Sequence, residues 1–229
     1  FGILPPPVTL DVLLEKYATG DERTVEDVRR RVARALAAVE KDPARWEPVF
    51  FKALQNGFIP GGRINSAAGT DLRATLINCF VQPVGDSISS TVGGKPGIYH
   101  ALRDAAETMR RGGGVGYDFS SIRPAGAKVI GTASSASGPV SYMQVFDQSC
   151  ATVESAGFRR GAQMGVLRCD HPDILVFIHA KEESGNLNNF NLSVGVTDAF
   201  MEAVKADGPW DHVFGGTVYH TVQARDLWN

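Results

Sequence analysis

The feature of the sequence that most constrains its fold is a change in glycine content and in hydrophobic pattern near Gly57. Up to residue 56 the chain reads as a small helical region. From Gly57 to Gly165 glycine is concentrated, and helical stretches alternate with short apolar strands. Such alternation is typical of an α/β domain. We therefore predict a helical region over residues 1–56 and an α/β domain over residues 57–229.

The clearest helix of the first region begins after Thr24. Apolar residues follow it at spacings of three and four and line one helix face: Val25, Val28, Val32, Leu36 and Val39. Thr24 suits the N-cap, and Asp27 suits the positive end of the helix dipole. Two further helices are predicted over residues 10–17 and 46–54.

The second region offers three candidate strands and four candidate helices. The strands are predicted at residues 76–82, 115–119 and 190–196, and the helices at residues 98–111, 140–153, 172–181 and 198–205. The tripeptide His171-Pro172-Asp173 reads as a helix start, because proline suits the first helical position.

Charge and hydropathy exclude several classes of protein. The net charge of −2 gives no basic field for nucleic acid or an anionic membrane. No apolar stretch approaches the roughly 20 residues that span a bilayer, and no signal peptide opens the chain. We expect a cytoplasmic protein. The start at Phe1 without a methionine, and the end at Asn229 within an unfinished helix pattern, suggest a fragment.

The cysteines and histidines form no metal-binding pattern. Cys79, Cys150 and Cys169 are odd in number and include no CxxC pair, so we expect neither a disulfide framework nor a zinc site. A buried packing role is the default for each cysteine. The five histidines match neither HExxH nor HxE, and we predict no metal site.

Residues 111–120, RRGGGVGYDF, contain three consecutive glycines after a predicted helix. The dinucleotide fingerprint fails here because the loop follows a helix and position 117 is tyrosine, which weakens a nicotinamide-dependent dehydrogenase. A helix C-cap explains one glycine or two. The third, with Gly116 as well, indicates close approach of a ligand or of a neighbouring segment.

Seven segments of the chain resemble the catalytic subunits of ribonucleotide reductases. In order, they are PGGRINSAAGT, LINCFVQPVGDS, RRGGGVGYDFSSIRP, SGPVSYMQVFD, ESAGFRRGAQMGVL, HPDILVFIHAK and NFNLSVGVTDAFM. The resemblance covers residues 57 to 228. The GGGVGYDFS stretch and the NCF at Cys79 look most like class II, the adenosylcobalamin-dependent enzymes.

The resemblance implies an N-terminal helical region followed by the first half of a ten-stranded α/β barrel. It implies radical reduction of ribonucleotides, as di- or triphosphates, to 2′-deoxyribonucleotides for DNA synthesis. Adenosylcobalamin, bound mainly outside this chain, would generate the radical. A thioredoxin-like dithiol would restore the enzyme, a deoxynucleoside triphosphate (dNTP) effector would regulate it, and a homodimer is expected.

Residue by residue, the resemblance assigns Cys79 to the reducing cysteine pair, whose oxidation to a disulfide supplies two electrons. Asn78, Gly113 and Gly114 match substrate-binding positions, and Arg159 is expected to reach the substrate. The radical cysteine, the second reducing cysteine and the assisting Asn and Glu would lie beyond Asn229.

Two further sets match regulatory positions. Asp86 and Arg123 match effector contacts, the arginine because its fork of donors suits phosphate. Lys128, in the loop after Pro124, would add positive charge. The loop that relays effector identity to the substrate would span residues 155–164, with these candidate residues: Ser155, Gly157, Arg159, Arg160 and Gly161.

Two alternatives remain open at this level. In the first, the protein is a class I rather than a class II reductase. In the second, it is a standalone dNTP-binding regulatory or dimerisation module. The sequence that follows Asn229 separates the enzyme from the module. We expect the chain as given to be inactive by itself, because the radical cysteine is missing from it.

Overall fold

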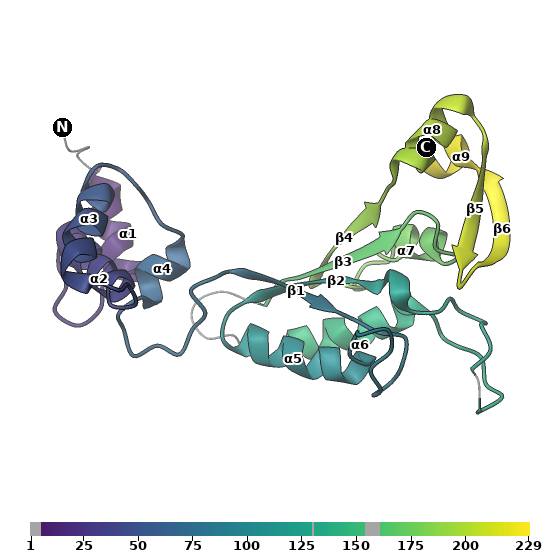
Figure 1. Ribbon diagram of the computed structural model, residues 1–229, viewed down its shortest axis with the longest axis horizontal. Coiled ribbons are helices and arrows are strands. Elements are labelled where there is room, and N and C mark those ends of the chain that lie inside the picture. The colour runs from purple at the N-terminus through teal and green to yellow at the C-terminus, as the bar shows by residue number, and fades with distance from the viewer. Residues whose placement is uncertain (1–5, 130, 154–160) are drawn as a thin grey trace. The chain divides into compact units, whose positions relative to one another are not determined.

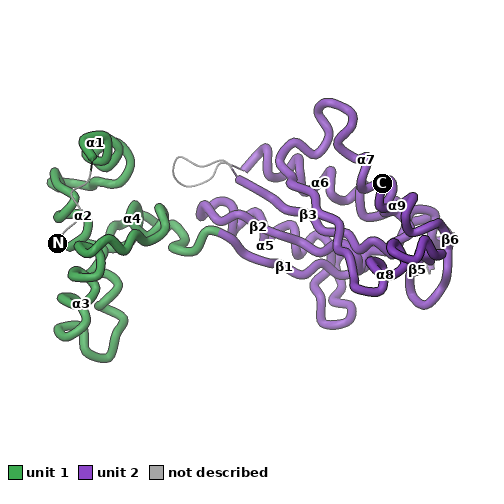
Figure 2. The backbone as a smooth tube through the Cα atoms, turned by 90° about the horizontal axis from the view of Figure 1, so that it is seen from above, with its two compact units in different colours: residues 1–78 green, residues 79–229 purple. Residues whose placement is uncertain are grey.

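The computed structural model describes residues 6–129, 131–153 and 161–229, which belong to two compact units. Unit 1 runs up to Asn78 and unit 2 begins at Cys79 (Figure 2). The boundary predicted near Gly57 lies earlier in the chain than this division. The difference arises because the short helix after Gly57 packs with the helices that precede it.

The described part of unit 1 is helical. It consists of α1 (Pro7–Lys16), α2 (Val25–Ala37), α3 (Pro43–Gln55) and α4 (Gly62–Ala67). The three predicted helices are confirmed, and α2 begins with a capping box. Thr24 Oγ1 accepts a hydrogen bond from the Asp27 amide at 3.2 Å, and Asp27 Oδ2 accepts one from the Thr24 amide at 2.9 Å.

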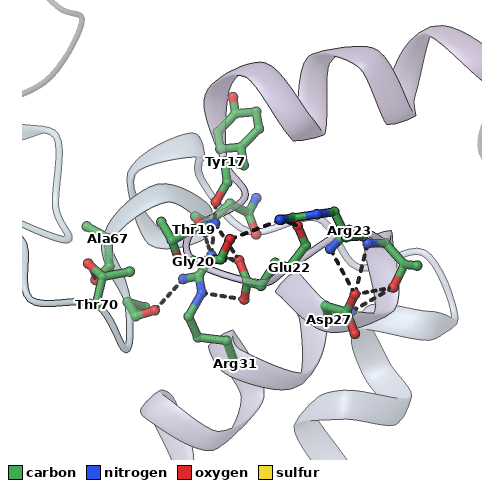
Figure 3. A network of polar contacts seen from close by, with 12 residues as sticks. Tyr17, Thr19, Gly20, Glu22, Arg23, Asp27, Arg31, Ala67 and Thr70 are labelled. Carbon is green, nitrogen blue, oxygen red and sulfur yellow. Dashed lines mark hydrogen bonds and ion pairs between the residues drawn. The ribbon is translucent and has the colours of Figure 1, made fainter.

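A nearly buried arginine ties α2 to the segments on either side of it. The Arg31 Nε donates to Glu22 Oε1 at 2.8 Å, and its Nη2 donates to the carbonyl of Tyr17 at 3.1 Å (Figure 3). The same Nη2 donates to the Asn65 carbonyl in α4 at 2.9 Å, and Nη1 donates to the Ala68 carbonyl. These bonds hold residues 62–68 in the helical unit.

Unit 2 is built around a parallel sheet in the order β1-β2-β3-β4. The strands are β1 (Cys79–Pro83), β2 (Gly114–Asp118), β3 (Gln163–Arg168) and β4 (Phe190–Gly195). Their connections contain α5 (Ile98–Arg110), the short 3-10 turn η1 (Phe119–Ser121), α6 (Pro139–Thr152) and α7 (Ile174–His179). The predicted α/β class is confirmed.

The two faces of this sheet differ. On one face Val115, Tyr117 and Phe190 are buried in the main core with α5 and α6, which lie together beneath the strands in Figure 1. Side chains alternate between faces along a strand, so Cys79 and Val81 point the other way. There Cys79 is exposed and Val81 is 88% exposed, so this face is open within unit 2.

The chain continues through α8 (Asp198–Ala206), the antiparallel pair β5 (Pro209–Phe214) and β6 (Thr217–Gln223), and α9 (Ala224–Trp228). The ring of Phe200 packs against Trp210 with centroids 5.0 Å apart. The strands β3, β5 and β6 were not predicted. The helix α7 begins at Ile174 rather than at the predicted Pro172. Before it, the residues form a turn in which the Asp173 amide donates to His171 Nδ1 and the Ile174 amide donates to the His171 carbonyl.

Candidate functional site

Cys79 is the first residue of β1 and is a free, exposed cysteine. In the register of the sheet it pairs with Gly114, the first residue of β2. The structure therefore brings these two predicted site residues side by side at the amino-terminal edge of the open face. Asn78 directly precedes Cys79, and its Oδ1 is buried without a hydrogen-bond partner among the described residues. An unpaired buried carbonyl is costly, so this oxygen suits an incoming donor.

The glycine run begins as a helix cap. Gly112 has a φ of +86° and donates to the Met109 carbonyl at 2.7 Å, while Gly113 donates to the Thr108 carbonyl at 3.0 Å. This pair of bonds is the Schellman arrangement that ends α5. A β-carbon on Gly113 would lie 2.7 Å from the Phe80 ring. Capping and packing thus explain Gly112 and Gly113, and substrate contact at Gly113 stays a prediction.

The predicted effector residues come together at the opposite edge of the sheet. The Arg123 Nε donates to Asp86 Oδ2 at 2.8 Å, and its backbone amide donates to Asp86 Oδ1 at 3.1 Å. Its Nη1 donates to the Lys128 carbonyl at 3.2 Å, while the Lys128 side chain is exposed. With Nε and Nη1 engaged, Arg123 Nη2 has no partner within the described ranges. It is the part of the guanidinium that can still meet an anion.

The two sets lie at different edges because the strands are parallel. Cys79 and Gly114 begin their strands, whereas Asp86 and Arg123 follow the ends of the same strands. Five-residue strands at about 3.3 Å per residue separate the edges by about 13 Å. The sheet therefore separates the candidate chemistry from the candidate regulatory contacts.

Four residues predicted for the relay loop, Ser155, Gly157, Arg159 and Arg160, lie outside the described residues. Gly161 is described, and a β-carbon on it would lie 2.9 Å from the sulfur of Cys150. Cys150 and Cys169 are buried, which confirms their predicted packing role. Burial raises the pKa of both thiols and so disfavours their reactive thiolate forms.

Sequence reasoning missed two residues that hold the backbone around Arg123. The tripeptide 171–173 precedes α7 as predicted and Asp173 is its N-cap residue, but the Asp173 side chain makes no capping bond there. Instead His171 Nε2 contacts the Ile122 carbonyl at 2.9 Å, and Asp173 Oδ2 accepts from the Ala125 amide at 2.9 Å. The sequence carried no signal for these contacts, which join positions far apart in the chain.

Comparison with known proteins gives the class of this chain. A family model described as the all-alpha domain of ribonucleotide reductase matches residues 6–73, and one described as its barrel domain matches residues 77–227. An all-alpha domain followed by the first strands and helices of a barrel domain agrees with the two units of the structure. The chain belongs to the ribonucleotide reductase family.

Among curated proteins, the chain is similar to the vitamin B12-dependent ribonucleoside-diphosphate reductase of Mycobacterium tuberculosis (strain CDC 1551 / Oshkosh). They are 44% identical over 209 residues, which cover 86% of this chain and 29% of the relative. The protein of the same name from Thermoplasma acidophilum is 41% identical over 175 residues, 75% of this chain and 22% of the relative. The chain thus spans less than a third of the length of these relatives.

No described helix is long and apolar enough to cross a bilayer.

Proposed function

We propose that this chain is part of a ribonucleotide reductase that converts ribonucleotides to 2′-deoxyribonucleotides, with Cys79 in its reducing cysteine pair. The observation that carries the proposal is the free, exposed thiol of Cys79 at the amino-terminal edge of the open sheet face. Structural cysteines of a core are buried, as Cys150 and Cys169 are. On the open face Cys79 and Val81 pair with Gly114 and Gly116, which have no side chains, so the thiol is accessible to a substrate.

The chemistry requires a second thiol, which we place outside this chain. The two thiols together give two electrons and two protons, and they become a disulfide. The ribose 2′-hydroxyl leaves as water, and a hydrogen takes its place. An external dithiol then reduces the disulfide by exchange. Cys79 is thus a group that is oxidised in every cycle, and turnover stops when it cannot be reduced again.

The cofactor that we propose is adenosylcobalamin, because both relatives described above are named as vitamin B12-dependent. When bound, adenosylcobalamin supplies the radical that starts the reaction. The described residues contain no group of three or more His, Cys, Asp or Glu side chains arranged to hold a metal ion. We assign no residue of this chain to the cofactor and expect the rest of the protein to bind it.

We further propose that Asp86, Arg123 and Lys128 bind a dNTP effector, and that residues 155–164 relay its identity to the substrate. The contacts among the first three residues support a preformed site in which Arg123 is held for a phosphate. We expect a cytoplasmic homodimer, and the free state of all three cysteines suits a reducing compartment.

The test is ribonucleotide reduction by the full-length protein with adenosylcobalamin and a dithiol. We expect the wild type to turn over repeatedly and Cys79→Ser to complete at most one turnover. A Cys169→Ala control removes a buried cysteine on the same unit and should keep repeated turnover. Robust repeated turnover by Cys79→Ser would remove Cys79 from the redox pair.

The same assay separates the alternatives. A class I reductase would show no activity with adenosylcobalamin but would be active with a separate radical-generating subunit. A standalone regulatory module would bind a dNTP and reduce nothing under either condition. Either result would replace the class II assignment.

A further inference from the structure

The tripeptide His171-Pro172-Asp173 lies in a tight turn between β3 and α7. His171 is 2% exposed, and its Nδ1 accepts a hydrogen bond from the Asp173 amide at 3.0 Å. The proton of the neutral ring must therefore be on Nε2, which donates to the Ile122 carbonyl at 2.9 Å. Burial lowers the pKa of His171, so the ring stays neutral at neutral pH.

The side chain of Asp173 completes the turn from the other side. Its Oδ2 accepts a hydrogen bond from the Ala125 amide at 2.9 Å. A β-carbon on Gly138, at the start of α6, would lie 2.4 Å from the same oxygen, so only glycine leaves room for the carboxylate. The negative charge also lies close to the positive end of α6, where it is stabilised.

The contacts of this turn enclose Arg123. The carbonyl before it, on Ile122, and the amide two residues after it, on Ala125, are both bound by residues 171–173. The Arg123 amide itself is bound by Asp86. Pro124 further restricts the backbone of the residue that precedes it. Arg123 is thus fixed on both sides by a segment that lies 48 positions away from Ala125 in sequence.

We propose that His171 and Asp173 are positioning residues for the dNTP effector site, because they hold the Arg123 backbone in its phosphate-binding conformation. This inference rests on the proposed effector role of Arg123. If the turn is broken, Arg123 occupies its binding conformation only part of the time, and the apparent affinity falls by that fraction. A fall of the competent fraction to about a tenth makes the dissociation constant about tenfold larger.

The experiment measures binding of dTTP to the full-length protein, together with ribonucleotide reduction without any effector. His171→Leu and Asp173→Ala should each weaken dTTP binding about tenfold and leave effector-free turnover unchanged. Asp173→Asn should bind dTTP nearly as the wild type does, because the amide oxygen can still accept from Ala125. A role in folding alone would lower effector-free turnover and thermal stability together with dTTP binding.

Asp170→Asn is the matched control. Asp170 lies in the same turn, but its carboxylate pairs with Arg168 and not with the 122–125 segment, so dTTP binding should not change. Unchanged dTTP binding in folded Asp173→Ala and His171→Leu overturns the inference. Arg123→Ala tests the proposed effector role of Arg123, on which this inference rests. If the wild type does not bind dTTP, or if Arg123→Ala does not weaken binding, the effector role fails and this inference fails with it.

Discussion

At the scale of single residues, the glycines between residues 112 and 116 are under different physical constraints. Gly112 adopts a positive φ, and Gly113 faces the Phe80 ring and the Thr108 methyl group. Gly116 has neither constraint, because a β-carbon on it would have its nearest neighbours at 3.9 Å. The sequence presents these glycines as one run, and only the packing around each separates them.

This difference gives a prediction for two alanine substitutions. Gly113→Ala should destabilise the full-length protein by about 1–3 kcal/mol, the usual cost of overpacking, because the new methyl group would lie 2.7 Å from Phe80. Gly116→Ala should leave the free energy of unfolding within about 1 kcal/mol of wild type or raise it. Denaturant unfolding of both variants measures the difference. Equal destabilisation by the two substitutions would contradict this account.

At the scale of elements, the β5–β6 hairpin carries a histidine pair across its two strands. His212 Nδ1 and His220 Nε2 are 2.6 Å apart, and the rings meet edge to face with centroids 4.5 Å apart. The His212 side chain is fully buried, and its Nε2 has no partner among the described residues. Burial, and secondly the neighbouring His220, lower the pKa of His212 to about 4 from 6.5. The folded hairpin therefore favours neutral His212.

A pH dependence follows from this lowered pKa. The unfolded chain binds a proton at His212 below pH 6.5, whereas the folded chain does so only near pH 4. His212 thus stabilises the fold fully above pH 6.5, and the contribution is lost as the pH falls towards 4. His212→Phe should reduce the slope of this part of the stability profile, while the exposed His100 makes His100→Phe a matched control. A wild-type profile that is flat between these pH values would show that His212 is not buried in its neutral form.

The hairpin also shows what local sequence reasoning left out. Gly215 and Gly216 connect β5 to β6, with φ values of +57° and +81°. A Gly-Gly pair between two segments of alternating apolar and polar residues is a strong hairpin signal. This element was therefore predictable. The strand β3 was less so, because Gln163 is buried by side-chain hydrogen bonds to Tyr117 and Phe146 that its sequence does not reveal.

At the scale of the whole molecule, the proposed chemistry and the proposed regulation occupy opposite edges of one sheet. Cys79 begins β1, whereas Asp86 and Arg123 follow β1 and β2. No hydrogen bond or ion pair among the described residues links Cys79 to the Asp86–Arg123 pair. The two functions should therefore be separable by mutation.

We expect Cys79→Ser in the full-length protein to bind dTTP with wild-type affinity. Arg123→Ala should reduce ribonucleotides at the wild-type rate without effector, but it should lose the response to dTTP. Binding and turnover assays on the same two variants check both statements. Loss of dTTP affinity in folded Cys79→Ser would show that the edges are coupled.

The sequence by itself determined the α/β class, most of the helices with the cap of α2, and the identity of the candidate residues. These features depend on periodicity and capping within a few positions, as the Thr24–Asp27 box shows. Only the tertiary structure decided which candidates meet. Asp86 reaches Arg123 across 37 positions, and Asp173 reaches Ala125 across 48. Such contacts arise because parallel strands joined by helices bring their carboxyl ends to one edge, and strand order and register do not follow from local sequence.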